Sequence, residues 1–222
     1  MTEEVLAPAY PLFRRPDAYH QKRCASALRN RIQRWSERRA LRALLDSAEG
    51  IHSVCDLPCG IGRSFELWAA AGLSVLGIEL SAPMAERAER ERAALELPGR
   101  VEIGDAFDAS AAHGRADLVA CLRFAYYFSP VQRRDLLAAL QSRSHRYLLI
   151  QYRVGNGVLG RWKSARAVVR MQRRATRAKH ACPWEEIRPE LESAGWSVLR
   201  MRRQSPLSDR VLILAERSAR KS

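Results

Sequence analysis

The sequence lacks any long apolar run. The longest mostly apolar stretch, about Trp68 to Leu80, is interrupted by Gly72, Ser74 and Gly77 and is too short to span a bilayer. The first ten residues, MTEEVLAPAY, include acids and no apolar core segment, which is not the pattern of a signal peptide. We therefore expect a cytoplasmic protein.

Cysteine is scarce and unpatterned. The five cysteines are an odd number, and they form neither a CxxC pair nor a Cys/His cluster. Neither a disulfide framework nor a zinc site is indicated, so no metal is expected. Cys55 and Cys121 lie in apolar, strand-like runs, where a free thiol acts as a small core side chain.

Acidic residues are few relative to basic ones. Against 38 Lys and Arg stand 24 Asp and Glu, a net charge of +14. Residues 14–42 hold ten basic residues and two acids, and residues 158–181 hold eight basic residues and no acid. Such a balance favours nucleic acid, an anionic membrane surface or acidic substrates as partners, unless it reflects only an arginine-rich solvated surface.

Strand and helix patterns alternate along the 222 residues, a length that suits one domain. Apolar runs predict strands at 53–56, 73–79, 101–103, 117–123, 146–152, 198–202 and 210–215. Helical patterns cover 16–45, 63–71, 81–95, 129–143 and 184–194, the last with its first turn at Pro189. Alternation predicts an α/β fold: a single doubly wound, mostly parallel seven-stranded sheet with helices on both faces. The short link before the last strand makes the C-terminal pair an antiparallel edge hairpin.

We divide the chain into two parts. Residues 1–46 form an N-terminal helical cap, and residues 47–222 form the main domain, with a basic lid insertion at about 155–182. The carboxyl ends of the first strands are where such sheets bind ligands.

The stretch VCDLPCGIGRSFE, residues 54–66, is a strand, a Gly-rich turn and the start of a helix. A dinucleotide fold would require GxGxxG, but Phe65 stands where the third glycine packs helix against strand. This counts against NAD as the ligand.

The same turn resembles motif I of the class I S-adenosylmethionine-dependent methyltransferases. Asp56-Leu-Pro58-Cys-Gly60-Ile-Gly62 matches D-x-G-x-G-x-G, with proline in the first glycine position. Three further motifs follow in the family's order: Glu79 in GIELS, Gly104 to Asp108, and Ala116 to Leu122. The resemblance covers about Ser53 to Arg217 and is to bacterial enzymes of the small-molecule type.

This resemblance implies a cofactor, S-adenosyl-L-methionine, with S-adenosyl-L-homocysteine as the product. It implies that Glu79 accepts the ribose hydroxyls and that Asp105 binds the adenine amino group. Asp56 orders the turn and reaches the ammonium, and Arg63, or Lys22 or Arg23, meets the carboxylate. The expected cofactor-binding residues are Asp56, Pro58, Gly60, Gly62, Arg63, Glu79, Leu80, Met84, Asp105, Ala106, Leu122 and Arg123.

Candidate catalytic residues are Tyr126, Tyr127 and His20. Related bacterial methyltransferases often show a histidine pair where Tyr126 and Tyr127 stand, and a tyrosine is a poor base because its ordinary pKa is about 10. Packing against the next helix is the alternative role for both. Candidate substrate-binding residues are Tyr19, Phe124, Tyr152 and Trp162.

We expect direct in-line methyl transfer to a small-molecule or lipid-linked, acidic acceptor. The alternatives are an RNA methyltransferase with phosphates on the basic rim, and an inactive cofactor-binding partner protein. RNA is the less favoured partner, because the chain lacks a base-methylation motif after the fourth strand and an appended RNA-binding module. The basic segment around Trp162 suits either a lid or peripheral contact with the inner face of an anionic membrane. The acceptor's identity, the methylated atom and the oligomeric state stay open.

Overall fold

We describe the protein from a computed structural model, which describes residues 28–110, 114–154, 180–206 and 208–218. The strands are β1 (Ser53–Asp56), β2 (Ser74–Glu79), β3 (Gly99–Ile103), β4 (Ala116–Cys121), β5 (Ser144–Arg153), β6 (Trp196–Arg203) and β7 (Arg210–Arg217). The helices are α3 (Leu28–Leu45), α4 (Phe65–Ala70), α5 (Ala82–Ala94), the 3-10 turn η1 (Ala125–Tyr127), α6 (Pro130–Arg143) and α8 (Trp184–Ser193). Every predicted strand is present, each within a few residues of its expected bounds.

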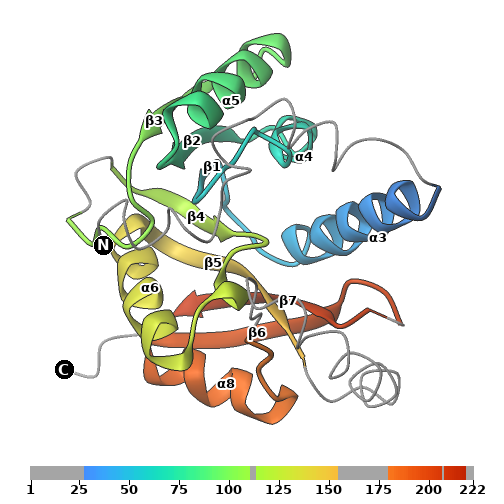
Figure 1. Ribbon diagram of the computed structural model, residues 1–222, viewed down its shortest axis with the longest axis vertical. Coiled ribbons are helices and arrows are strands. Elements are labelled where there is room, and N and C mark those ends of the chain that lie inside the picture. Colours follow the sequence, from blue (N-terminus) through green and yellow to red (C-terminus); the bar gives the residue numbers. More distant parts are fainter. Residues whose placement is uncertain (1–27, 111–113, 155–179, 207, 219–222) are drawn as a thin grey trace, which may run out of the picture.

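The strands form one sheet in the order β3-β2-β1-β4-β5-β7-β6 (Figure 1). The pairs β1–β2, β1–β4, β2–β3 and β4–β5 are parallel. The last strand, β7, lies between β5 and β6 and is antiparallel to both. This confirms the predicted mostly parallel, doubly wound sheet with an antiparallel C-terminal pair.

Helices cover both faces of the sheet, and each face has its own core. Alternate residues of one strand point to opposite faces, so Val54 joins the core under α3, α4 and α5, whereas Cys55 joins the core under α6 and α8. Both side chains are fully buried. Figure 1 shows α3 to α5 and the pair α6 and α8 arranged around the sheet in this way.

Local signals set where the helices begin. Ser129 and Gln132 form the predicted capping box at the start of α6: the Gln132 N–H donates to Ser129 Oγ, and the Ser129 N–H donates to Gln132 Oε1.

The predicted start of the last helix was wrong. Pro189 lies inside α8, which begins at Trp184 after Pro183. Glu185 and Glu186 in the first turn favour that start through the helix dipole. The burial of Ile187 and Leu191 on either side of Pro189 adds packing that offsets the hydrogen bond the proline lacks.

The parallel strands bring four chain segments to one carboxyl edge. The segments that follow β1, β2, β3 and β4 all emerge there, because β1, β2, β3 and β4 run in one direction. The N-terminal helix α3 packs near the same sheet, and Gln204 Nε2, in the turn after β6, donates to the Gln33 carbonyl at 2.9 Å. Within the part of the chain that the structure describes, no helix is long and apolar enough to cross a membrane.

Candidate active site

The turn after β1 is fastened to both neighbouring strands. The Leu57 N–H donates to the Ala120 carbonyl and the Cys59 N–H to the Ile78 carbonyl, each at 2.9 Å. The Leu57–Pro58 peptide is cis. Gly60 has φ +64° and Gly62 has φ +78°, backbone conformations that side chains with a Cβ rarely adopt. The two glycines therefore let the chain make a tight turn at the sheet edge.

Phe65, the residue in place of a third glycine, fills the space behind this turn. Its ring is fully buried. A Cβ on Gly62 would lie 2.8 Å from that ring, and one on Gly77 of β2 would lie 3.2 Å from it. Two glycines thus make room for one phenylalanine, so this helix–strand contact differs from that of a dinucleotide fold.

Glu79 ends β2 beside the turn. Its carboxylate accepts the Gly60 N–H at 3.0 Å and the Ser81 N–H at 3.1 Å, and the residue is 8% exposed. Burial raises the pKa of Glu79, whereas the backbone hydrogen bonds from Ser81 and Gly60 act in the opposite direction. The backbone fixes this acid at the carboxyl end of its strand.

Asp56, the last residue of β1, is buried beneath the turn. One oxygen accepts the Trp68 Nε1–H at 3.0 Å, which ties β1 to α4. Burial raises the pKa of Asp56 to about 6, against the opposing effects of the Trp68 hydrogen bond and the Arg123 charge. Its position suits ordering the turn, the first of the two roles expected for it.

Arg123, two residues after β4, links four elements. It has φ +63°, and its N–H donates to Gln151 Oε1 at 3.1 Å. Its guanidinium donates to Ser64 Oγ at 2.9 Å and lies 3.4 Å from a Glu37 oxygen, while Gln151 Nε2 donates to the other Glu37 oxygen at 3.0 Å. The network joins α3, β5, the exit of β4 and the start of α4.

Glu37 has no predicted role from the sequence, although it is the only acid in α3. Burial by itself would raise its pKa, but Arg123, Arg63 and Arg210 together with the Gln151 hydrogen bond lower it overall. A lone acid in an arginine-rich helix was the available signal.

The segment after β3 holds two acids with different surroundings. Asp105 Oδ1 accepts the Phe107 N–H at 2.9 Å, which shapes the loop beside the turn. Asp108 instead pairs with buried Arg143, at 3.3 Å between Oδ2 and Nη2. The Gly104 N–H donates to the Glu79 carbonyl at 3.1 Å, so the exits of β2 and β3 are adjacent.

Aromatic residues crowd the exit of β4. Phe107, Phe124 and Phe128 form edge-to-face pairs, with centroids 4.9 Å apart for Phe107–Phe128 and 4.7 Å for Phe124–Phe128. The rings of Tyr126 and Tyr127 lie 4.8 Å apart, and Tyr126 is 2% exposed. Tyr127 also packs against the core that includes Leu136 and Leu137 of α6. A catalytic role for either tyrosine stays a prediction.

His180, a residue without a predicted role, lies beside this cluster. Its backbone N–H donates to the Tyr126 carbonyl at 3.0 Å, and its side chain is exposed. It is separated by 54 positions in sequence from Tyr126, so nothing in the sequence indicated the contact.

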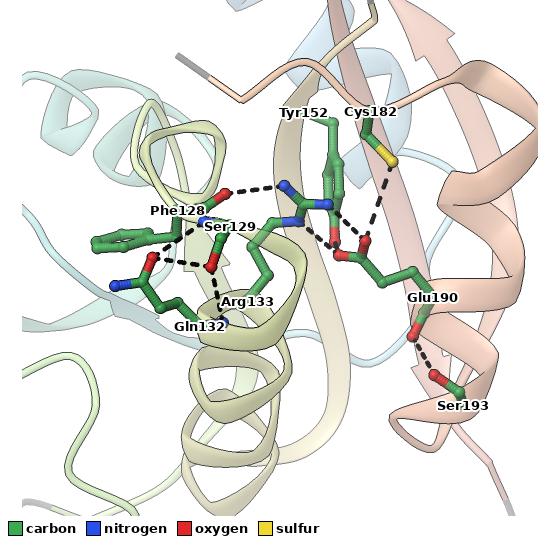
Figure 2. Close-up of polar contacts among 8 residues, drawn as sticks. All are labelled: Phe128, Ser129, Gln132, Arg133, Tyr152, Cys182, Glu190 and Ser193. Carbon is green, nitrogen blue, oxygen red and sulfur yellow. Dashed lines mark hydrogen bonds and ion pairs between the residues drawn. The ribbon is translucent and has the colours of Figure 1, made fainter. Parts of the chain in front are cut away.

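Tyr152, expected to contact substrate, is engaged inside the fold (Figure 2). Its hydroxyl donates to Glu190 Oε1 at 2.7 Å, and the Glu190 carboxylate also receives Arg133 Nε and Nη2 at 2.7 and 2.6 Å. The pKa of Tyr152 is raised well above its ordinary value, mainly by burial and secondly by the nearby Glu190 carboxylate. This cluster joins α6, β5 and α8.

The other expected residues divide by position. Met84, Ala106 and Leu122 are buried near the turn, Pro58 and Arg63 are half-buried within it, and Leu80 is exposed beside Glu79. His20, Tyr19 and Trp162, with Lys22 and Arg23, lie outside the described residues, as does nearly all of the lid insertion. Their placement stays a prediction. Among the described residues, no group of His, Cys, Asp and Glu side chains could hold a metal ion.

A cavity of about 540 Å³ opens between α3, the turn and α5. Six arginines and three glutamates line it together with apolar groups that include Trp35, Ile61 and Leu67. Ser64 and Arg123 border it, so it adjoins the network described above.

Comparison with known proteins agrees with this geometry. Residues 54–144, which include all four motifs, match the family described as "Methyltransferase domain". No curated protein matches the chain. Among solved structures, magnesium protoporphyrin IX methyltransferase (ChlM) from Synechocystis PCC 6803 with bound SAH is 19% identical, with a TM-score of 0.73 over 97% of this chain and 100% of that one.

Two more structures show the same fold. The Synechocystis enzyme with bound SAM is 18% identical, with a TM-score of 0.70 and 98% of each chain covered. An S-adenosylmethionine-dependent methyltransferase from Clostridium acetobutylicum is 12% identical, with a TM-score of 0.63 over 91% of this chain and 97% of that one. Residues 54–144 thus match a methyltransferase domain that spans the four motifs, and nearly the whole chain shares the fold of these solved methyltransferases.

Proposed function

We propose that the enzyme methylates a small-molecule acceptor that carries an acidic group, by direct in-line transfer. The observation that carries the proposal is the charge of α3. Its only acid, Glu37, is buried, whereas Arg31, Arg38, Arg39 and Arg42 are exposed and Arg34 is half-buried. This helix, at the carboxyl edge, offers cations to solvent and attracts anions.

Similar structures favour a small acceptor. The Synechocystis protein acts on magnesium protoporphyrin IX, as its name states. The likeness, at 19% identity, bears on the class of acceptor. It supports the small-molecule class over a macromolecule.

The residues at the sheet edge fit the cofactor. The turn carries two left-handed glycines, and among the described residues a Cβ on Gly60 would meet only Met84 Cε, at 3.7 Å. Glu79 would hold the ribose hydroxyls, since a carboxylate can accept from both. Asp105 would take the adenine amino group, while Arg63 and Arg123 would meet the carboxylate.

When bound, S-adenosylmethionine supplies an electrophilic methyl on a positively charged sulfur that leaves readily. The protein's contribution is then largely orientation of the acceptor and exclusion of water. Tyr126, Tyr127 and Phe124 would orient the acceptor from the exit of β4. The backbone of His180 is hydrogen-bonded to Tyr126, and its imidazole would take a proton from an acceptor that must lose one.

Label transfer tests the proposal. The full-length protein is incubated with methyl-labelled S-adenosylmethionine and an extract separated into small molecules, lipids, RNA and protein. We expect label in the small-molecule fraction, in compounds retained by an anion exchanger. Label in RNA, with activity that falls steeply as salt rises, would support the RNA methyltransferase reading instead. Cofactor binding without label in any fraction would support the inactive partner.

A further inference from the structure

We propose that the cavity between α3 and α5 binds an acidic group, a carboxylate or phosphate, attached to an apolar body. This inference rests on the proposed function, because it assigns the cavity to the acidic end of the acceptor. Its volume of about 540 Å³ lies within the range of small-molecule sites.

The charge of the described lining favours an anion. Six guanidinium groups face three carboxylates, an excess of three positive charges. Two of the carboxylates already have partners: Glu66 pairs with Arg38, and Glu37 pairs with Arg123 and Gln151. The excess therefore lies with the other arginines.

Two of these arginines are available to a ligand. Arg31 comes from α3 and Arg87 from α5, so they line the cavity from different elements. Neither makes a hydrogen bond or an ion pair with any part of the chain that the structure describes. A guanidinium group binds carboxylate or phosphate through paired N–H donors, so these residues suit both acids.

Apolar groups in the same cavity indicate more than a bare ion. Trp35 is 62% exposed and lines the cavity with Leu41, Ile61 and Leu67. A free inorganic anion would leave these groups against water, whereas an acid with an aromatic or aliphatic body would cover them.

The cavity's position connects it with the reaction. It is bordered by Gly62 and Ser64 of the turn after β1 and by Arg123, which donates to Ser64. A ligand held here lies next to the turn assigned to the cofactor. Binding of the acid would orient the rest of the acceptor toward the sheet edge.

Calorimetric titration of the full-length protein tests the inference with three probes: 1-naphthyl phosphate, 1-naphthoate and the neutral 1-naphthamide. We expect both anions to bind about tenfold more tightly than the amide, the effect of one good charge-assisted contact. Equal affinity for the amide would overturn the inference. Inorganic phosphate binding as tightly as 1-naphthyl phosphate would also overturn it, because the apolar body would then contribute nothing to affinity.

A pair of double variants places the site. Arg31→Gln with Arg87→Gln should weaken both anions about tenfold and leave the amide unchanged. The matched control, Arg42→Gln with Arg90→Gln, removes the same charge from exposed positions of the same helices outside the cavity, and should retain wild-type affinity. Equal loss in both variants would show that net charge, not the cavity, attracts the anions, and would overturn the assignment.

Titration with S-adenosylhomocysteine separates this inference from the proposed function. Both double variants should bind it as the wild type does. A wild type that binds the naphthyl anions but not S-adenosylhomocysteine would contradict the proposed function and leave the cavity assignment intact. Binding of S-adenosylhomocysteine without any preference for the naphthyl anions would overturn the cavity assignment and leave the proposed function intact.

Discussion

The carboxylate of Glu79 accepts the backbone N–H of Gly60 at 3.0 Å, so the end of β2 and the turn after β1 form one unit. A second N–H, from Ser81, holds the same carboxylate at 3.1 Å. An acceptor group held by two backbone donors is already oriented before a ligand arrives, which lowers the entropy lost on binding.

Replacing Glu79 should therefore weaken cofactor binding. We expect Glu79→Gln to bind S-adenosylhomocysteine at least about tenfold more weakly, because hydrogen bonds to a charged acceptor are lost. The amide oxygen can still accept the Gly60 N–H, so the fold should persist by circular dichroism. Glu86→Ala, an exposed acid of α5, is the control and should bind like the wild type. Unchanged calorimetric affinity in Glu79→Gln would exclude the ribose role.

Asp56 should make stability depend on pH. Its pKa in the folded state is raised from 3.8 to about 6 by burial, so the folded protein binds a proton more tightly than the unfolded chain. The cost of the buried charge is therefore absent below pH 3.8 and complete above pH 6, and stability falls as pH rises between these values. At 1.36 kcal/mol per pKa unit the change is about 3 kcal/mol.

Asp56→Asn removes this ionisation and should remove that part of the pH dependence. The measurement is the free energy of unfolding by urea at pH 4 and at pH 7 in both proteins. The difference between the two pH values should change by about 2 kcal/mol in the variant, relative to the wild type, because Asp56 of the unfolded chain is already partly ionised at pH 4. The new amide lowers stability equally at both values, so it cancels. Parallel pH profiles would show that Asp56 is not buried as a charge.

The Glu190 carboxylate should stabilise the fold far more than a surface acid on the same helix. Removing it leaves Arg133, 2% exposed, without its ionic partner, and a buried charge left unpaired costs about 3–5 kcal/mol. Glu190→Ala should lose about that much in urea unfolding. Glu192→Ala is the matched control: its pair with Arg188 is about half exposed, and the change should stay below about 1 kcal/mol. Similar losses in both variants would contradict the role of burial.

Tyr152→Phe distinguishes two roles for Tyr152. If the hydroxyl serves only this cluster, the variant should lose about 1 kcal/mol of stability and keep the wild-type KM for the acceptor identified by label transfer. A raised KM with unchanged stability would instead support the substrate contact expected from the sequence.

The elements could be predicted where the signal is local. Apolar runs predicted each strand, and the capping box formed by Ser129 and Gln132 predicted where α6 begins. Motif order placed Asp56, Glu79 and Asp105 at one edge of the sheet, because parallel strands end there. Their binding of the cofactor stays a prediction.

The connections between distant segments could not be predicted. Glu37 meets Gln151 across 114 positions, and its role depends on how α3 packs against β5. Arg143 is fully buried, although arginines usually lie at the surface, because its helix faces the core at that position. Which arginines line a cavity likewise depends on tertiary packing. The composition showed only that basic residues are in excess.

The last prediction concerns Arg143, whose buried guanidinium makes only part of its possible hydrogen bonds. The residue is 0% exposed, and Nη2 reaches the Asp108 carbonyl at 3.0 Å and its carboxylate at 3.3 Å. Nε and Nη1 are buried without a hydrogen-bond partner in the described part of the chain. Unpaired buried donors and a desolvated cation both cost free energy.

Arg143→Met should therefore leave stability unchanged or raise it, since an apolar side chain of similar length replaces a poorly satisfied charge. Asp108→Ala should instead lower the free energy of unfolding by about 3 kcal/mol, because it leaves the buried guanidinium without its counter-charge. Combining the two changes should restore most of that loss, a coupling that a double-mutant cycle measures. Additive effects would mean that the two side chains do not interact energetically. Strong destabilisation by Arg143→Met alone would mean that the buried guanidinium contributes net stability to the domain.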